Sequence, residues 1–174
     1  MAHRNIHYEA AFEDYLRSRG WPYVAVDEAK KAIFSGAAIK SFDFLVYSSC
    51  GANLLVDVKG RKFPDSGGGM RQKTSRAWEN WITRQDVHGL GEWEKVFGSD
   101  FQAVLVFAYW LQGPPQRAPF QDVHWFRQRH YAFMAIPLAD YATAARPRSA
   151  KWQTLTMPTA EFRKQIRQVG DLLG

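Results

Sequence analysis

Residues 100–111, DFQAVLVFAYWL, are the most apolar run of this chain, and they constrain its fold more than any other segment. A strand that is apolar on both faces is typical of the centre of a sheet that is covered on each side. The length of 174 residues suits one domain, and aromatic side chains, at 15% of the chain, are sufficient for a packed core. We therefore predict a layered α/β domain with a central mixed sheet.

Hydrophobic periodicity predicts the other elements of this domain. Helices are expected at 6–18, 86–98 and 160–173, with a shorter one at 138–145. Strands are expected at 21–26, 40–48, 53–63, 100–111 and 129–138, with short ones at 78–83 and 154–158. Thr83 and Asp86 resemble a capping box before the second helix, with Asp in place of the usual Glu.

The connecting segments are predicted mainly from their turn residues and charges. Residues 49–53 are typical of a hairpin turn, and the three consecutive glycines within 64–76 indicate a flexible loop. Residues 146–153 are interpreted as a basic connector. Residues 27–34 fit either a helical turn or an extended arm.

The strand predicted at 53–63 carries two ionisable side chains within an apolar sequence. Because side chains alternate along a strand, Leu55, Asp57 and Lys59 share one face. In the preceding strand Asp43 interrupts another apolar run, where an unpaired charge is costly to bury. The short turn makes these two strands antiparallel neighbours, so Asp43 and Asp57 are expected to converge near one end of the ribbon.

Two carboxylates in close proximity need a proton, a basic neighbour or a divalent cation to offset their repulsion. Their hard oxygen atoms favour Mg²⁺, and Mn²⁺ is expected to substitute for it. Such a cation binds phosphate oxygens and stabilises charge at phosphorus. Lys59 can orient or deprotonate an attacking water, or stabilise the transition state. The pattern therefore predicts a site for phosphodiester hydrolysis.

This arrangement resembles the PD-(D/E)XK nuclease superfamily, in which an Asp on the second core strand precedes (D/E)-x-K on the third. Here Phe42-Asp43 is followed, after thirteen residues, by Asp57-Val58-Lys59, so that Phe replaces the Pro of the family name. The first helix, HYEAAFEDYLRSRGW, looks much like that of the Holliday-junction resolvases in this superfamily. The downstream order, WENWITRQDVHGLGEWEKVFG and then DFQAVLVFAYW, is also similar to theirs.

The resemblance implies a restriction-endonuclease-like fold, a three-layer core with a central mixed β-sheet flanked by helices. This core would cover about 6–138 of a single domain, 1–174, with 139–174 as a C-terminal appendage. The implied activity is that of a Mg²⁺-dependent DNA endonuclease acting in repair, recombination, junction resolution, restriction or defence. The resolvases suggest branched or structured DNA as the partner, and a homodimer, because cutting two strands symmetrically calls for two sites.

The resemblance also implies a role for individual residues. The implied metal ligands are Glu9, Asp43, Asp57 and the Val58 carbonyl. Lys59 would be the catalytic base or an electrostatic stabiliser. Glu13 lies one turn beyond Glu9 on the same flank of the first helix, and it remains the alternative ligand.

Basic and polar side chains near this site are the expected contacts to nucleic acid. A formal net charge of +6 favours a polyanionic partner. The candidates are Arg61, Lys62, Arg71, Lys73 and Arg76, together with Arg84 and Gln85, which face the site in the resembling topology. For the residues in the glycine-rich loop and for the basic segment 146–153, a solvated surface is an equally good interpretation.

Two other functions remain open. The chain could be a non-catalytic nucleic-acid-binding module, or a partner-dependent subunit that retains the nuclease fold. It could also be a basic interaction protein in which Asp57 and Lys59 form an ordinary ion pair. The presence together of Asp43, Asp57 and Lys59 argues against a degenerate site.

Cysteine content and hydropathy indicate the cellular compartment in which the protein is expected. Cys50 is the one cysteine, which excludes a disulfide framework within the chain. No signal peptide is visible, and no apolar run has the length of a membrane-spanning helix. We expect a cytoplasmic protein that does not associate with membranes.

Overall fold

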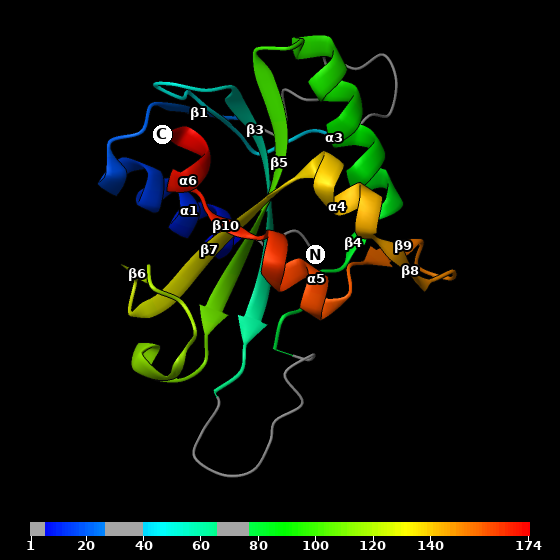
Figure 1. Ribbon diagram of the computed structural model, residues 1–174. Coiled ribbons are helices and arrows are strands. Elements are labelled where there is room, and N and C mark those ends of the chain that lie inside the picture. The colour runs from blue at the N-terminus through cyan, green and yellow to red at the C-terminus, as the bar shows by residue number, and fades with distance from the viewer. Residues whose placement is uncertain (1–5, 27–39, 66–76) are drawn as a thin grey trace.

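The computed structural model describes residues 6–26, 40–65 and 77–174, and these carry all structural statements below. The main sheet is 7-stranded, with the order β1-β2-β3-β5-β7-β10 and with β6 paired to β7 (Figure 1). Its strands are β1 (Tyr23–Ala25), β2 (Phe44–Val46), β3 (Asn53–Phe63), β5 (Phe101–Leu111), β6 (His124–Phe126), β7 (Arg129–Pro137) and β10 (Arg167–Gln168). The predicted segment 27–34 lies outside the described residues, and so do residues 66–76 of the predicted glycine-rich loop, with Arg71, Lys73 and Arg76.

Helices lie on both faces of this sheet, and three further strands form a small, separate sheet. The helices are α1 (Ile6–Arg19), α3 (Arg84–Phe97), α4 (Leu138–Ala144), α5 (Thr159–Gln165) and α6 (Gly170–Leu173), with a 3-10 turn at Pro115–Arg117. The second sheet has the order β4-β9-β8, from β4 (Ile82–Thr83), β9 (Thr154–Thr156) and β8 (Arg146–Ser149). No described helix is long and apolar enough to cross a lipid bilayer.

The centre of the sheet is the parallel pair β3 and β5. Their register runs without interruption from Asn53↔Phe101 to Phe63↔Leu111, while β2 and β7 flank the pair in antiparallel orientation. Residues 103–109 of β5 are all buried, as expected for a strand with apolar side chains on both faces. The predicted central mixed sheet is confirmed.

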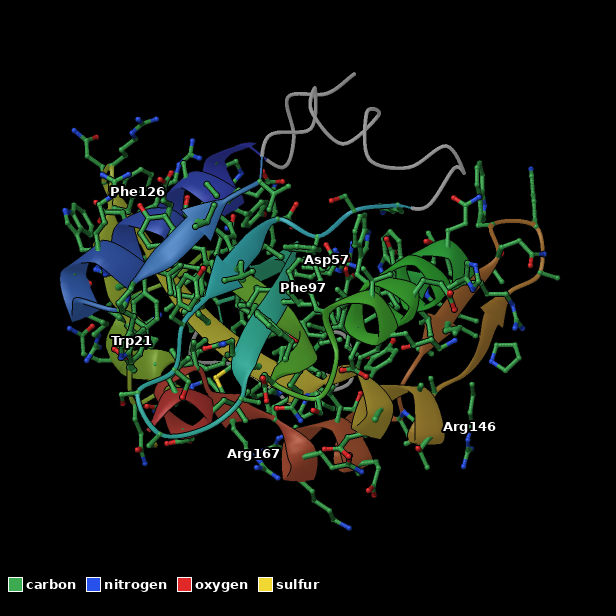
Figure 2. All side chains as sticks on the ribbon, turned by 90° about the horizontal axis from the view of Figure 1, so that it is seen from above. Trp21, Asp57, Phe97, Phe126, Arg146 and Arg167 are labelled. Carbon is green, nitrogen blue, oxygen red and sulfur yellow. The ribbon has the colours of Figure 1, made fainter. Side chains whose placement is uncertain are left out.

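Alternation along β3 and β5 supplies two separate hydrophobic cores. Val56 and Val58 belong to the core under α1, which includes Phe12 and, from the C-terminus, Leu173. Leu55 belongs to the core on the opposite face, formed with α3, α4 and α5. Figure 2 shows the sheet between α1 and α3. Asp57 and Lys59 alternate with the valines, so they face the α3 side.

The C-terminal segment differs from its prediction as a single helix over 160–173. It forms α5, then β10 on the edge of β7, and then α6. Phe162 packs in the α3-side core, whereas Val169 and Leu173 pack in the α1-side core. A continuous helix cannot bury side chains on both faces of a sheet, so the chain breaks and crosses the sheet edge as a strand.

Two shorter predictions are also corrected. The strand expected at 78–83 is limited to Ile82–Thr83, because Trp78 packs in the core and Asn80 bonds to Met157 instead of to a strand partner. The connector expected at 146–153 begins as β8, which pairs with β9. The residues predicted as an appendage are thus joined to the core through β4–β9 and β7–β10 pairing.

Candidate active site

Asp57 and Lys59 form a buried ion pair on the face of β3 that is turned toward α3. The Lys59 Nζ lies 2.8 Å from Asp57 Oδ2, and the two side chains are 12% and 6% exposed. This confirms that the two groups share one face, as alternation predicted. An ion pair so well shielded from water interacts more strongly than one on the surface.

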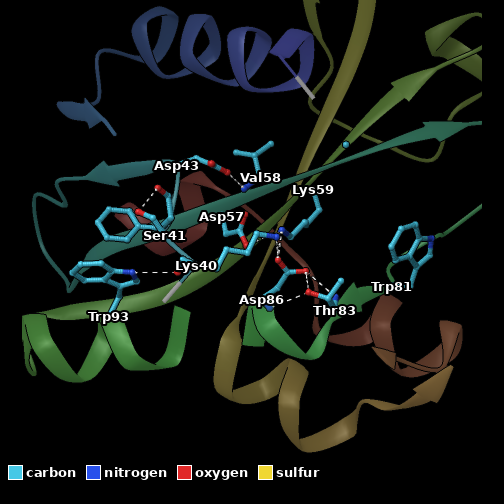
Figure 3. Close-up of polar contacts among 12 residues, drawn as sticks. Lys40, Ser41, Asp43, Asp57, Val58, Lys59, Trp81, Thr83, Asp86 and Trp93 are labelled. Atoms are coloured by element: carbon cyan, nitrogen blue, oxygen red, sulfur yellow. Dashed lines mark hydrogen bonds and ion pairs between the residues drawn. The ribbon is translucent and has the colours of Figure 1, made fainter. Parts of the chain in front are cut away.

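Asp43 lies just before β2 and next in register to Asp57, at a point where the alternation of side chains between the two faces of the sheet breaks. Phe44 packs in the α1-side core but Phe42 packs in the α3-side core, although residues two apart in a regular strand share a face. The Asp43 N–H donates to the Val56 carbonyl at 2.8 Å, and its Oδ2 accepts from the Val58 N–H at 2.7 Å. Asp43 therefore bonds to β3 on both sides of Asp57, through its backbone N–H at Val56 and through its carboxylate at Val58, and Figure 3 shows the bond to Val58.

The N–H and C=O groups of Val58 lie beyond the end of β2 and have no β2 residue paired with them. Pairing between β2 and β3 ends at Phe44↔Val56. In a strand the N–H and C=O of one residue point to the same edge. Because the Val58 N–H points to Asp43, its carbonyl also points to the edge where β2 has turned away.

Asp86 is a third carboxylate at the site, and the sequence indicated only its capping role. It is buried at the start of α3, and its Oδ1 lies 3.0 Å from Lys59 Nζ. The predicted capping box with Thr83 is confirmed: Asp86 Oδ2 accepts from the Thr83 N–H at 2.7 Å, and the Asp86 N–H donates to Thr83 Oγ1 at 3.1 Å. Burial alone would raise the pKa of Asp86, but Lys59 and then Lys40 outweigh it and lower this pKa.

The two carboxylates hold the Lys59 ammonium in its charged form. Burial alone would lower the pKa of Lys59, but the charges of Asp57 and Asp86, with their hydrogen bonds, raise it. An ammonium that donates to two carboxylates is fixed in position as well as in charge. Nothing in the sequence near Lys59 indicated this second partner, because the contact depends on where α3 begins in space.

A glycine in α3 allows the segment before β2 to approach this helix. A Cβ at Gly89 would lie 2.5 Å from the Lys40 carbonyl oxygen, which also accepts a hydrogen bond from Trp93 Nε1 at 3.2 Å. The Lys40 ammonium reaches Asp86 from this position. Close packing of backbone on α3 thus brings a second, half-exposed cation to the site.

The first turn of α1 is held against β3 next to Lys59. A Cβ at Gly60 would lie within 2.5 Å of three carbons of the Tyr8 ring, so the ring packs directly on the glycine. Glu9, the next residue, lies in this first turn. Glu13 instead accepts from the Tyr23 hydroxyl at 2.8 Å and pairs with Arg17 at 3.2 Å. Glu13 is thus held by contacts with β1 and within α1, and the choice of Glu9 as the helix ligand stays a prediction.

Replacing Gly60 with alanine is expected to lower the free energy of unfolding by about 1–3 kcal/mol, because the new methyl group overlaps the buried Tyr8 ring. Chemical denaturation measures this change. Gly91→Ala is the matched control, since its Cβ would meet Leu138 Cδ2 at an ordinary 3.7 Å and alanine is the better helix former. Equal stability of Gly60→Ala and the wild type would contradict the close packing of α1 on β3.

The predicted nucleic-acid contacts take different positions around the site. The Arg61 guanidinium lies over the Trp81 ring at 4.2 Å and donates to the Gly60 and Trp81 carbonyls, so it is largely occupied within the protein. Lys62 is exposed and points to the opposite face, 5.4 Å from the centre of the Trp110 ring. Arg84 and Gln85 are exposed at the start of α3, next to Asp86.

Oxygen donors suited to a hard divalent cation are present at this edge, in Asp43, Asp57 and the Val58 carbonyl. Within the described ranges, no three His, Cys, Asp or Glu side chains are gathered closely enough to hold a metal ion. The four-ligand set with Glu9 therefore stays a prediction. The donor chemistry fits Mg²⁺ or Mn²⁺, and the register brings two of the predicted carboxylates together.

The mixed sheet flanked by helices is the restriction-endonuclease-like fold. A solved structure that shares it is Hjc, a Holliday junction resolvase from the archaeal hyperthermophile Archaeoglobus fulgidus. The two structures align with a TM-score of 0.57 over 97% of this chain and 99% of that one, at 14% sequence identity. No family model and no curated protein matches the sequence. The likeness at this identity is one of fold.

Proposed function

We propose that this chain is a metal-dependent DNA endonuclease that hydrolyses phosphodiester bonds at Asp43, Asp57 and Lys59. The observation that carries the proposal is the contact of Asp43 with the strand on both sides of Asp57, beside the buried Asp57–Lys59 pair. In this chain these three residues lie within a restriction-endonuclease-like fold. Carboxylates next to a fixed ammonium suit a reaction in which negative charge develops on a phosphate.

The proposed metal ligands are Asp43, Asp57, Glu9 and the Val58 carbonyl. When bound, Mg²⁺ supplies a Lewis acid that stabilises charge on a phosphate oxygen and favours ionisation of water. The protein contributes the position of each oxygen. Asp43 is fixed by the Val58 N–H, and the first turn of α1 is fixed by the packing of Tyr8 on Gly60.

The family resemblance allows two roles for Lys59, catalytic base or electrostatic stabiliser. We propose that it acts as the electrostatic stabiliser. Its ammonium donates to Asp57 and Asp86, and their charges keep it protonated. Asp86 holds Lys59 from the α3 side, so the ammonium would keep one carboxylate partner if Asp57 held a cation. Lys59 can then donate to a non-bridging phosphate oxygen as the attacking water adds to phosphorus.

The substrate and assembly follow from the same proposal. The net charge of +6 and the exposed Lys62 and Arg84 suit a polyanion. Hjc is a Holliday junction resolvase, and we extend branched DNA and a homodimer to this chain as part of the proposal. Mg²⁺ is the proposed cofactor, and Mn²⁺ is expected to substitute.

The test is cleavage of labelled four-way junctions, linear duplex, single-stranded DNA and RNA by the purified chain, in Mg²⁺, Mn²⁺ or EDTA. We expect DNA products with either metal and none in EDTA. Cleavage that persists in EDTA would overturn the metal requirement. Binding to every substrate without cleavage would instead support a nucleic-acid-binding module. Sedimentation of the free protein and of its DNA complex tests the dimer.

A further inference from the structure

The β8–β9 hairpin, residues 146–156, forms a basic surface with an exposed aromatic side chain. It carries Arg146, Arg148 and Lys151 and has no acidic residue. Trp152, in the turn, is 68% exposed, and the Lys151 ammonium lies 5.2 Å from its ring centre. A single exposed aromatic side chain is common on protein surfaces, but here the ring lies among three exposed basic residues.

This hairpin is fixed relative to the candidate active site. β9 pairs with β4, so that Thr154 lies opposite Thr83, and the Arg84 N–H donates to the Gln153 carbonyl at 2.8 Å. Thr83 is in turn the N-cap of α3 and accepts a hydrogen bond from the N–H of Asp86, which pairs with Lys59. The hairpin therefore holds a defined position beside the start of α3, from which it extends outward (Figure 1).

A tryptophan and two arginines connect the hairpin with β3, the strand that carries Asp57 and Lys59. The Trp81 ring, shown beside the site in Figure 3, lies 4.2 Å from the Arg61 guanidinium and 5.3 Å from that of Arg148. Arg61 follows Lys59 by two residues on the same face of β3, and Arg148 belongs to β8. Positive charge and aromatic surface thus continue from the site to the hairpin.

We propose that the β8–β9 hairpin binds an unpaired DNA strand next to the bond that is cut. Arg146, Arg148 and Lys151 contact its phosphates, and the exposed ring of Trp152 stacks on a base. This inference rests on the proposed nuclease function and names the substrate class: DNA with unpaired nucleotides beside the scissile phosphate.

The argument for an unpaired strand is the position of the tryptophan. In duplex DNA the faces of the bases are stacked on one another, so a side chain at the tip of a hairpin cannot cover them. In a single strand the faces are available, and stacking on aromatic rings combines with a basic track along the backbone. Phosphate contacts by the three basic residues supply affinity without reading sequence.

The test compares binding of labelled oligothymidylate and of a duplex of equal length, in EDTA, by the full chain and its variants. Trp152→Ala is expected to weaken single-strand binding roughly tenfold, while Trp152→Phe keeps most of it, because phenylalanine preserves stacking. Arg148→Ala is expected to lower the salt dependence of binding by roughly one phosphate contact. With a branched substrate in Mg²⁺, Trp152→Ala should raise KM and leave kcat unchanged.

Matched controls lie at the other end of the molecule or on another surface. Trp125, next to Phe126 on β6, is 56% exposed, and Phe126 and Arg146 lie at opposite ends of the view in Figure 2. Arg167 is an exposed arginine on β10. Trp125→Ala and Arg167→Ala are expected to change the Kd by less than about twofold, since neither residue belongs to the proposed binding hairpin.

Three results would overturn the inference. These are equal losses in Trp152→Ala and Trp125→Ala, failure of Trp152→Phe to restore binding, or an equal loss on duplex and single strand. Each leaves the nuclease proposal standing if the chain still cleaves DNA. Conversely, hairpin-dependent binding by a chain that never cleaves would overturn the nuclease proposal, and with it the placement of the strand beside a scissile bond, while single-strand binding by the hairpin would stand.

Discussion

Asp57→Ala is expected to reduce DNA cleavage by roughly a thousandfold or more, because it removes both a proposed metal ligand and the buried partner of Lys59. Asp57→Asn should lose nearly as much, since the amide keeps the shape of the side chain but not its charge. Single-turnover cleavage of a junction substrate at saturating enzyme measures the chemical step. Binding in EDTA should persist in both variants, because the basic surfaces are unchanged.

The control for this prediction is Asp100→Asn, which changes an exposed carboxylate that lies before β5. It should cleave at the wild-type rate. Circular dichroism and thermal unfolding confirm that the Asp57 variants are folded, as expected while Asp86 still pairs with Lys59. Near wild-type cleavage by a folded Asp57→Ala variant would exclude this site as the centre of hydrolysis.

Asp86→Ala is expected to have the largest effect on stability, a loss of about 3–5 kcal/mol in the free energy of unfolding. The substitution leaves Lys59 with one carboxylate in a buried setting and removes the Asp86 half of the capping box, the bond that its carboxylate accepts from the Thr83 N–H. Loss of a capping interaction contributes about 1 kcal/mol of this. Urea denaturation followed by tryptophan fluorescence measures the change.

Glu92→Ala is the matched control on the same helix. Glu92 pairs with Lys95 at 2.6 Å on the surface, where Lys95 is 76% exposed. Its loss should lower stability by less than about 1 kcal/mol. Similar losses for the two variants would show that the buried position of Asp86 adds nothing.

The dependence of unfolding free energy on acid pH is a second, independent test of the Asp86–Lys59 ion pair. Burial raises the pKa of Asp86, whereas the charges of Lys59 and Lys40 lower it. The net effect is a pKa below the ordinary value of 3.8. A carboxyl whose pKa is lower in the folded state stabilises fully above its unfolded pKa, and this contribution is lost as pH falls. The wild type should therefore lose stability below about pH 4 more steeply than Asp86→Asn.

The sequence predicted most accurately those elements whose side-chain pattern is set by burial. The bounds of β3 match the predicted 53–63, and the apolar run at 100–111 is the central strand β5. Alternation alone was enough to place Asp57 and Lys59 on one face. The largest wrong prediction, a single helix at 160–173, arose because periodicity indicates that a residue is buried but not on which face of the sheet it is buried.

Two features of the site could not be read from the sequence for a related reason. Asp86 was identified as a cap, but its contact with Lys59 depends on the path from β3 through β4 to α3. The contact of Asp43 with the Val58 N–H depends on a break in alternation, which the pattern FDF does not show. Both are contacts between elements, and local propensity carries no information about them.

The crossing of the C-terminal chain has a consequence for the behaviour of the protein in concentrated solution. A long strand at the edge of a sheet offers unpaired N–H and C=O groups to other chains, and it is a common starting point for aggregation. β7 would be such an edge, but β6 pairs along Arg129 to Tyr131 and β10 along Met134 and Ala135. At the opposite edge, β1 has 3 residues. The terminal segment thus shields the sheet from extension by a second molecule.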